Sequence, residues 1–111
     1  MASEDCVFCK IVRGEIPSKK EYEDEDIIVF QDIHPKAPVH LLIVPKEHLD
    51  EFYELQDLGI WAKMSKIAQD LVRRYKLEEK GYRLVNNGGG ANLITHLHLH
   101  LLGDIPHTRE I

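Results

Sequence analysis

The stretch His96-Leu97-His98-Leu99-His100-Leu101-Leu102 alternates histidine with leucine, which is a pattern with a period of two residues. Successive side chains of a β-strand point to opposite faces. Read as a strand, the stretch therefore places its three imidazoles on one face and its leucines on the other. A helix would scatter these side chains around its circumference, so the strand is favoured. Next-but-one residues of a strand lie about 7 Å apart, which predicts a row of rings facing a polar cleft.

A row of imidazoles suits chemistry near neutral pH. The ordinary pKa of histidine is about 6.5, so the ring can act as a nucleophile, a proton shuttle or a metal ligand. Solvent-facing strand positions usually carry Thr, Lys or Glu, so an incidental histidine face is disfavoured. A purely metal-binding row remains an alternative.

Length and composition limit the class of protein. The chain has 111 residues, which predicts a single domain over 1–111. The formal net charge of −5 argues against binding a nucleic acid polymer. There is no apolar run that would span a membrane and no apolar leader, so we expect a cytoplasmic protein with no membrane partner. In that reducing compartment a structural disulfide between the two cysteines is not expected.

Hydrophobic patterning places the other elements around the histidine stretch. Three- and four-residue spacing predicts one long helix over 55–75, packed on one face of a sheet. A short helix is expected at Cys6–Ile11, before the turn residues Gly14-Glu15-Ile16-Pro17. The remaining strands, of which the first two form a hairpin, are expected at Lys20–Glu23, Ile27–Phe30, Val39–Val44 and Tyr82–Val85.

Cys6 and Cys9 form a Cys-x-x-Cys pair that has three interpretations. A redox motif normally follows a strand, and here too few residues precede it. A zinc site would need two more ligands, for which His48 is a candidate. The third interpretation is incidental packing of both cysteines within one helical turn.

Several polar positions lie next to the predicted strands. The loop Asn86–Asn92 contains three glycines, whose backbone N–H groups could cradle a phosphate, although a plain hairpin loop is the commoner case. Its position before the histidine stretch favours the cradle and makes Gly90 and Asn92 candidates. Asp32 either binds sugar hydroxyls or opens a turn. His40 alone would be an ordinary core residue, and it becomes a site candidate beside the histidine row.

Together these pieces resemble the histidine-triad (HIT) family, and the compact length and N-terminus look most like its Hint branch. The resemblance rests on residues 96–102, Cys6–Ile11, Asp32-Ile33, Ala37–His40 and Pro45–His48, in the family's order. It implies an α+β fold with a five-stranded antiparallel sheet, one long helix and a short N-terminal helix. It also implies a homodimer that joins two sheets into one.

The resemblance implies a purine nucleotide ligand. His98 corresponds to the nucleophile, which attacks the α-phosphorus to form a nucleotidyl-histidine that water hydrolyses. Asp32 corresponds to the ribose ligand, and Asn86 and His100 correspond to phosphate contacts. We expect His40 to fix the tautomer of His98 and catalysis to need no metal. The positions that correspond to the base pocket are Val7, Phe8, Ile11 and Phe30.

In zinc-containing relatives the matching ligands would be Cys6, Cys9, His48 and His96. Zinc would give His96 a structural role, whereas without zinc His96 could take part in catalysis. Leu93 stands where the family usually has a hydroxyl, so either Asn92 or Thr95 replaces that donor, or the leaving-group step is slow. The expected reaction is hydrolysis of purine nucleoside phosphoramidates or related nucleotidyl conjugates. The alternatives are a dinucleoside polyphosphate hydrolase and a nucleotide-binding or zinc-scaffold protein with little turnover.

Overall fold

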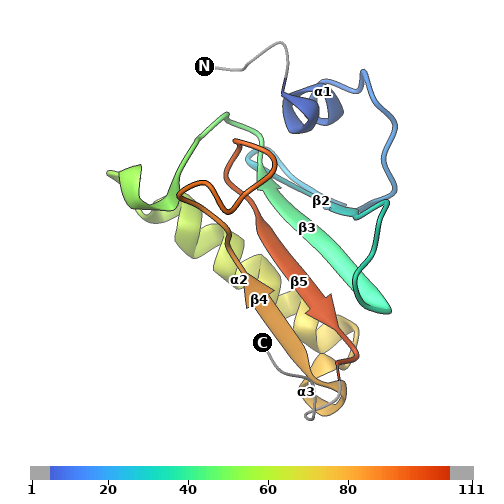
Figure 1. Cartoon of the computed structure of the whole chain (residues 1–111). Coiled ribbons are helices and arrows are strands. Elements are labelled where there is room, and N and C mark those ends of the chain that lie inside the picture. The colour runs from blue at the N-terminus through green and yellow to red at the C-terminus, as the bar shows by residue number, and fades with distance from the viewer. Residues whose placement is uncertain (1–5, 106–111) are drawn as a thin grey trace.

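The computed structural model describes residues 6–105, which form an α+β fold around one sheet (Figure 1). The sheet has five strands in the order β1-β2-β3-β5-β4, and every neighbouring pair is antiparallel. This confirms the predicted fold class. The strands are β1 (Lys20–Glu23), β2 (Ile27–Gln31), β3 (Val39–Pro45), β4 (Tyr82–Val85) and β5 (Leu99–Gly103). The helices are α1 (Val7–Val12), η1 (Phe52–Glu54), α2 (Gly59–Arg74) and α3 (Leu77–Lys80).

Apolar side chains cover both faces of β2 and β3, which explains their unbroken hydrophobic sequences. Ile27 and Val29 of β2 face the core under α2, whereas Ile28 and Phe30 face the core under α1. Residues of β3 alternate in the same way, because successive strand residues point to opposite faces. The long helix and the short helix therefore lie on opposite sides of the sheet (Figure 1).

The histidine stretch is less regular than we predicted, because β5 begins at Leu99 and not at His96. Ile43 of β3 pairs with Leu99, so the continued register would place Pro45 opposite Leu97. Proline has no N–H to donate, and the ladder ends there. Leu97 instead donates its N–H to the carbonyl of Leu49 at 2.6 Å.

The alternation of side chains between the two faces is retained although β5 begins at Leu99. Leu97, Leu99 and Leu101 all lie in the core beneath α2. His96 and His98 are buried on the other side, where α1 packs. The strand interpretation therefore gives the correct faces for residues that the hydrogen-bonded sheet does not include.

The long helix also begins later than predicted, at Gly59 and not near residue 55. The carboxylate of Asp57 accepts the N–H of Gly59 at 2.9 Å, and the separate turn η1 precedes it. The short helix α3 was not predicted; it follows Lys76, whose φ of 57° ends the preceding helix. None of the helices described over residues 6–105 has the length and apolar character needed to cross a membrane.

Candidate functional site

Four imidazoles gather on the α1 side of the sheet. His40 comes from β3, His100 from β5, and His96 and His98 from the segment that leads into β5. The rings of His98 and His100 lie 4.9 Å apart between centroids, and those of His40 and His100 lie 5.1 Å apart. The structure therefore brings together the four histidines that the sequence marks as catalytic candidates.

Backbone carbonyls fix the protonation of two of these rings. Nε2 of His96 lies 2.8 Å from the carbonyl of Pro45, and Nδ1 of His98 lies 2.6 Å from the carbonyl of His96. A carbonyl can only accept, so each of these nitrogens carries the hydrogen. The lone pair is consequently on Nδ1 of His96 and on Nε2 of His98.

A backbone N–H fixes the protonation of the other two rings. The N–H of Lys36 donates to Nδ1 of His40 at 3.0 Å, so His40 carries its hydrogen on Nε2. The Nε2–H of His40 in turn donates to Nδ1 of His100 at 2.9 Å. His100 is left with an Nε2–H donor. Our expectation that His40 sets the tautomer of His98 is wrong: the carbonyl of His96 does so, and His40 sets the tautomer of His100.

Burial keeps the imidazoles neutral. Desolvation lowers the pKa of His96 and His100 to about 4 in each case, from the ordinary 6.5. It also lowers the pKa of His98 and His40, although the Asp32 carboxylate opposes the shift in both. At neutral pH the row therefore offers lone pairs and N–H donors and no positive charge.

Asp32 lies beside the His40–His100 pair. One carboxylate oxygen lies 3.5 Å from Nε2 of His40, and the other accepts the N–H of His34 at 2.8 Å. The side chain therefore both opens a turn, as an ordinary aspartate does, and reaches the histidine row.

Asn86 at the end of β4 contacts the backbone of the histidine segment. Its side-chain N–H donates to the carbonyl of His98 at 3.0 Å. Asn92 similarly donates to the carbonyl of Ile94 at 3.2 Å. Both amides hold the segment that carries His98 in place, which is a role the sequence did not indicate.

The glycine loop contacts a carboxylate. The N–H of Gly89 donates to both oxygens of Glu51, at 3.2 and 3.3 Å. Gly88 approaches the same carboxylate so closely that a Cβ there would lie 2.7 Å from Oε1. The expected anion-binding loop thus binds an internal anion, and Glu51 had no distinguishing sequence pattern. Gly90 of the same loop has a φ of 94°, which favours glycine, and Leu93 is fully exposed.

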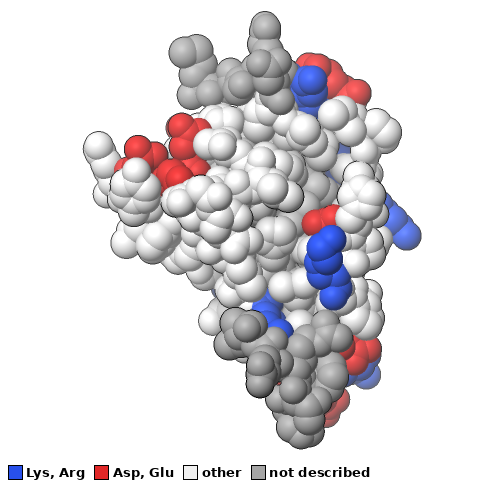
Figure 2. Space-filling view, viewed as in Figure 1, with Lys and Arg blue, Asp and Glu red and all other residues white. Residues whose placement is uncertain are grey.

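Glu51 borders a cavity of about 390 Å³ beside this loop, and the cavity wall is acidic. Figure 2 shows carboxylates gathered at one edge of the molecule, over the segment that precedes α2. The acidic residues that line the cavity are Glu47, Asp50, Glu51, Glu54 and Asp57.

Three of the four expected base-pocket residues pack together between α1 and the sheet. Phe8, Ile11 and Phe30 are buried in one cluster, whereas Val7 is 43% exposed. The ring of Phe8 meets the ring of His98 edge-on, with centroids 4.9 Å apart. The short helix therefore adjoins the histidine row through an aromatic contact.

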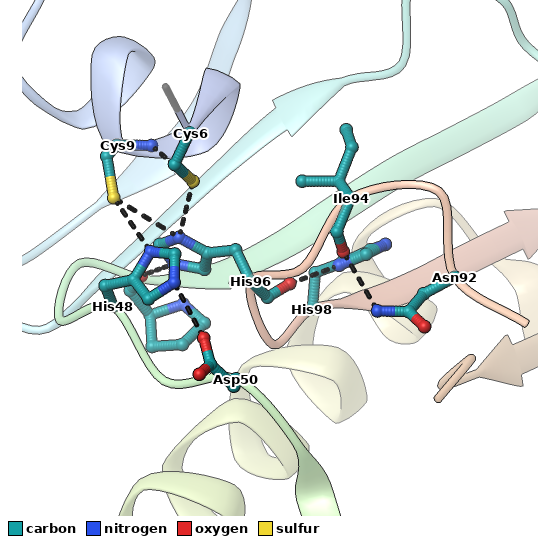
Figure 3. A network of polar contacts seen from close by, with 9 residues as sticks. Cys6, Cys9, His48, Asp50, Asn92, Ile94, His96 and His98 are labelled. Carbon is teal, nitrogen blue, oxygen red and sulfur yellow. Dashed lines mark hydrogen bonds and ion pairs between the residues drawn. The ribbon is translucent and has the colours of Figure 1, made fainter. Parts of the chain in front are cut away.

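Cys6, Cys9, His48 and His96 form a compact cluster at the opposite end of the row from Asp32 (Figure 3). Sγ of Cys6 lies 3.2 Å from Nδ1 of His96, and Sγ of Cys9 lies 3.1 Å from Nδ1 of His48. The Nε2 atoms of both histidines are bonded elsewhere, to the Pro45 carbonyl and to Asp50 at 2.8 Å. Both Nδ1 lone pairs consequently point at sulfur. Zinc bonded at about 2.3 Å to sulfur and 2.0 Å to nitrogen has ligand-to-ligand spacings of about 3.5 Å, so this donor set fits the ion.

Comparison with known proteins identifies the arrangement. The family described as "Scavenger mRNA decapping enzyme C-term binding" matches residues 5–110. A HIT-like protein of Chlamydia trachomatis is 43% identical over 101 residues, which cover 87% of this chain and 90% of the relative.

Two solved structures have the same fold. A HIT family hydrolase from Clostridium thermocellum is 43% identical, with a TM-score of 0.89 and 99% of each chain covered. A zinc-bound histidine triad protein from Mycobacterium smegmatis is 30% identical, with a TM-score of 0.83, covering 97% of this chain and 81% of that one. The chain belongs to the histidine-triad family.

Proposed function

We propose that this protein, as a single domain over residues 1–111, hydrolyses purine nucleoside phosphoramidates or related nucleotidyl conjugates, as the Hint branch of the family does. The observation that carries the proposal is the state of His98. This buried ring donates Nδ1–H to the His96 carbonyl at 2.6 Å, and burial lowers its pKa. A neutral imidazole with its lone pair on Nε2 is the form that attacks phosphorus.

The reaction balances in two steps. Nε2 of His98 forms a bond to the α-phosphorus while the bond from phosphorus to the leaving amine breaks, and the amine takes up one proton from solvent. Water then attacks the same phosphorus, loses one proton to solvent and breaks the bond from phosphorus to Nε2, which releases the nucleoside monophosphate and returns His98 to its neutral form. Covalent catalysis of this kind replaces one difficult displacement by two easier ones.

The neighbouring residues support the remaining roles. The Nε2–H of His100 is a donor for a phosphate oxygen, because its Nδ1 accepts from His40 at 2.9 Å. The carboxylate of Asp32 can accept the ribose hydroxyls. Asn86 keeps His98 in line through the His98 carbonyl, and its second side-chain N–H serves the phosphate. The base would rest against the apolar cluster of Phe8, Ile11 and Phe30 and against the exposed Val7 of α1.

The acidic cavity favours an amine leaving group over a second nucleotide. Glu51 connects the cavity wall to the glycine loop, which leads directly into the histidine row. A leaving group that extends along the glycine loop would meet these carboxylates, which repel the additional phosphates of a dinucleoside polyphosphate and tolerate a neutral or cationic amine. Dinucleoside polyphosphates are therefore the second candidate class of substrate.

We further infer that zinc occupies the Cys6, Cys9, His48 and His96 cluster as a structural ion. Burial raises the pKa of the Cys6 thiol, so a thiolate there needs a cation beside it. When bound, zinc would cross-link the α1 region to the histidine segment and take no part in phosphoryl transfer. His96 would then be a ligand and not a proton donor. The two unpaired thiols also suit the reducing cytoplasm, where we place the protein.

We propose a homodimer formed through β4. Among the described residues this strand lies at the edge of the sheet, and Tyr82 and Leu84 on it are 50% and 44% exposed. An edge strand with exposed apolar side chains can pair with the same strand of a second copy and continue the sheet.

The test is release of AMP from adenosine 5′-phosphoramidate by the native chain and by His98→Ala. We expect turnover that falls by roughly a thousandfold or more in the variant, with AMP binding retained. His34→Gln, which changes an exposed imidazole, should keep full activity. AMP binding without turnover in the native chain would support the scaffold alternative. Faster cleavage of diadenosine tetraphosphate would favour the polyphosphate alternative.

A further inference from the structure

A second group of metal-binding side chains lies at the other end of the histidine row. Asp32, His40 and His100 each offer one ligand atom, and these atoms all lie within 4.8 Å of one another. Nε2 of His40 lies 2.9 Å from Nδ1 of His100 and 3.5 Å from a carboxylate oxygen of Asp32. The group shares no residue with the cysteine cluster, and His98 lies between the two.

The spacing suits a tetrahedral transition metal. An ion bonded at about 2.0–2.1 Å to nitrogen and oxygen sets its ligand atoms about 3.4 Å apart. The His40–Asp32 distance of 3.5 Å already matches, and the His40–His100 distance of 2.9 Å would have to widen by a few tenths of an ångström. Two imidazoles and one carboxylate with an open fourth position suit Zn²⁺ or Co²⁺, whereas Mg²⁺ and Ca²⁺ prefer oxygen ligands alone.

We propose that Asp32, His40 and His100 form a second site for a divalent transition-metal ion of the Zn²⁺ class, and that its occupation excludes the nucleotide. The exclusion follows from Asp32, because the ion would engage the carboxylate to which the proposed function gives the ribose hydroxyls. On His100 the ion would take Nδ1 and leave the Nε2–H donor unchanged. This part rests on the proposed function. The metal site itself rests only on the positions of the three side chains.

The protonation of the rings predicts that this site is the weaker of the two. His100 already offers an Nδ1 lone pair, but Nε2 of His40 carries a hydrogen. Metal binding must move that hydrogen to Nδ1 of His40, where the N–H of Lys36 then loses its acceptor. In the cysteine cluster both imidazole lone pairs already face sulfur. We therefore expect the cysteine cluster to fill first.

The experiment is a Co²⁺ titration of the full chain, followed by visible absorption and calorimetry. The first equivalent of Co²⁺ should bind at the cysteine cluster and give the intense sulfur-to-cobalt absorption bands of a thiolate site. The second equivalent of Co²⁺ should bind more weakly and should not increase these bands. Asp32→Asn and His100→Gln should lose the second equivalent and keep the first, which also shows that each variant folds. The matched control His34→Gln changes an imidazole two residues from Asp32 and should bind both.

AMP provides the test of exclusion. A saturating concentration of AMP should weaken the second equivalent by roughly tenfold or more and leave the first unchanged. The site is refuted if the native chain binds one equivalent only, or if His100→Gln binds two. Two equivalents with no effect of AMP would refute the exclusion alone. A chain that binds two equivalents but releases no AMP from the phosphoramidate would overturn the proposed function and leave the metal site standing.

Discussion

Lowering the pH from about 7 to about 5 should destabilise the metal-free fold by about 2 kcal/mol through His96 alone. This side chain is 1% exposed, and burial lowers its pKa to about 4 from the ordinary 6.5. In the unfolded chain, His96 binds a proton below about pH 6.5. In the native chain, His96 stays unprotonated down to about pH 4. The neutral ring therefore stabilises the fold above pH 6.5, and this stability is lost as the pH falls toward 4.

The size of this loss of stability follows from the pKa shift of His96. A difference of about 2.5 pKa units corresponds to about 3 kcal/mol when complete, and about 2 kcal/mol of it falls between pH 7 and pH 5. His98, His40 and His100 have lowered pKa values for the same reason and add to the loss. Acidic groups such as Glu21 have pKa values below the ordinary 4.5, so they lose their contribution only at lower pH. The chosen window therefore isolates the histidines.

The assay is urea unfolding followed by the fluorescence of Trp61, at several pH values and with a chelator present so that metal release does not add to the slope. His96→Asn should flatten the pH dependence even where it lowers stability at every pH. His34→Gln should leave the slope unchanged. A native chain that loses less than about 1 kcal/mol between pH 7 and pH 5 would show that burial of neutral histidine is not what governs stability here.

Three further changes test separate parts of the site. Asn86→Leu removes the N–H that donates to the His98 carbonyl, a bond worth about 1 kcal/mol, so kcat should fall about fivefold; KM should rise as well, because the N–H proposed for the phosphate is also lost, and Asn87→Leu is the control. Leu84→Lys places a charge on the edge strand and should give monomers by sedimentation, whereas Tyr53→Lys, at a position 77% exposed away from that edge, should stay dimeric. Cys9→Ser should lose the zinc measured by elemental analysis and lower Tm by several degrees, and an equally stable metal-free variant would contradict the structural role.

The sheet could be predicted well from the sequence because the patterns that specify its strands and faces are patterns of side chains. The period of two in the histidine stretch gives the correct faces, and the apolar runs at β2 and β3 mark strands buried on both sides. The spacing of the Cys6–Cys9 pair and the resemblance together select the four side chains that the structure clusters. Where the sequence prediction fails, as at the start of β5, the cause is a residue on the neighbouring strand: Pro45 ends the ladder that His96 and His98 would otherwise have joined.

The parts that sequence does not reveal are mostly backbone atoms. The Pro45 carbonyl, the His96 carbonyl and the Lys36 N–H decide which nitrogen of each ring carries hydrogen, and any residue type other than proline could supply that N–H. One consequence concerns His96, whose ring faces the cysteines while its carbonyl holds Nδ1 of His98. Because one residue serves both groups, movement of the proposed zinc site would move the carbonyl that orients the proposed nucleophile. An ion that takes no part in phosphoryl transfer would then still influence its rate, through the position of a single backbone oxygen.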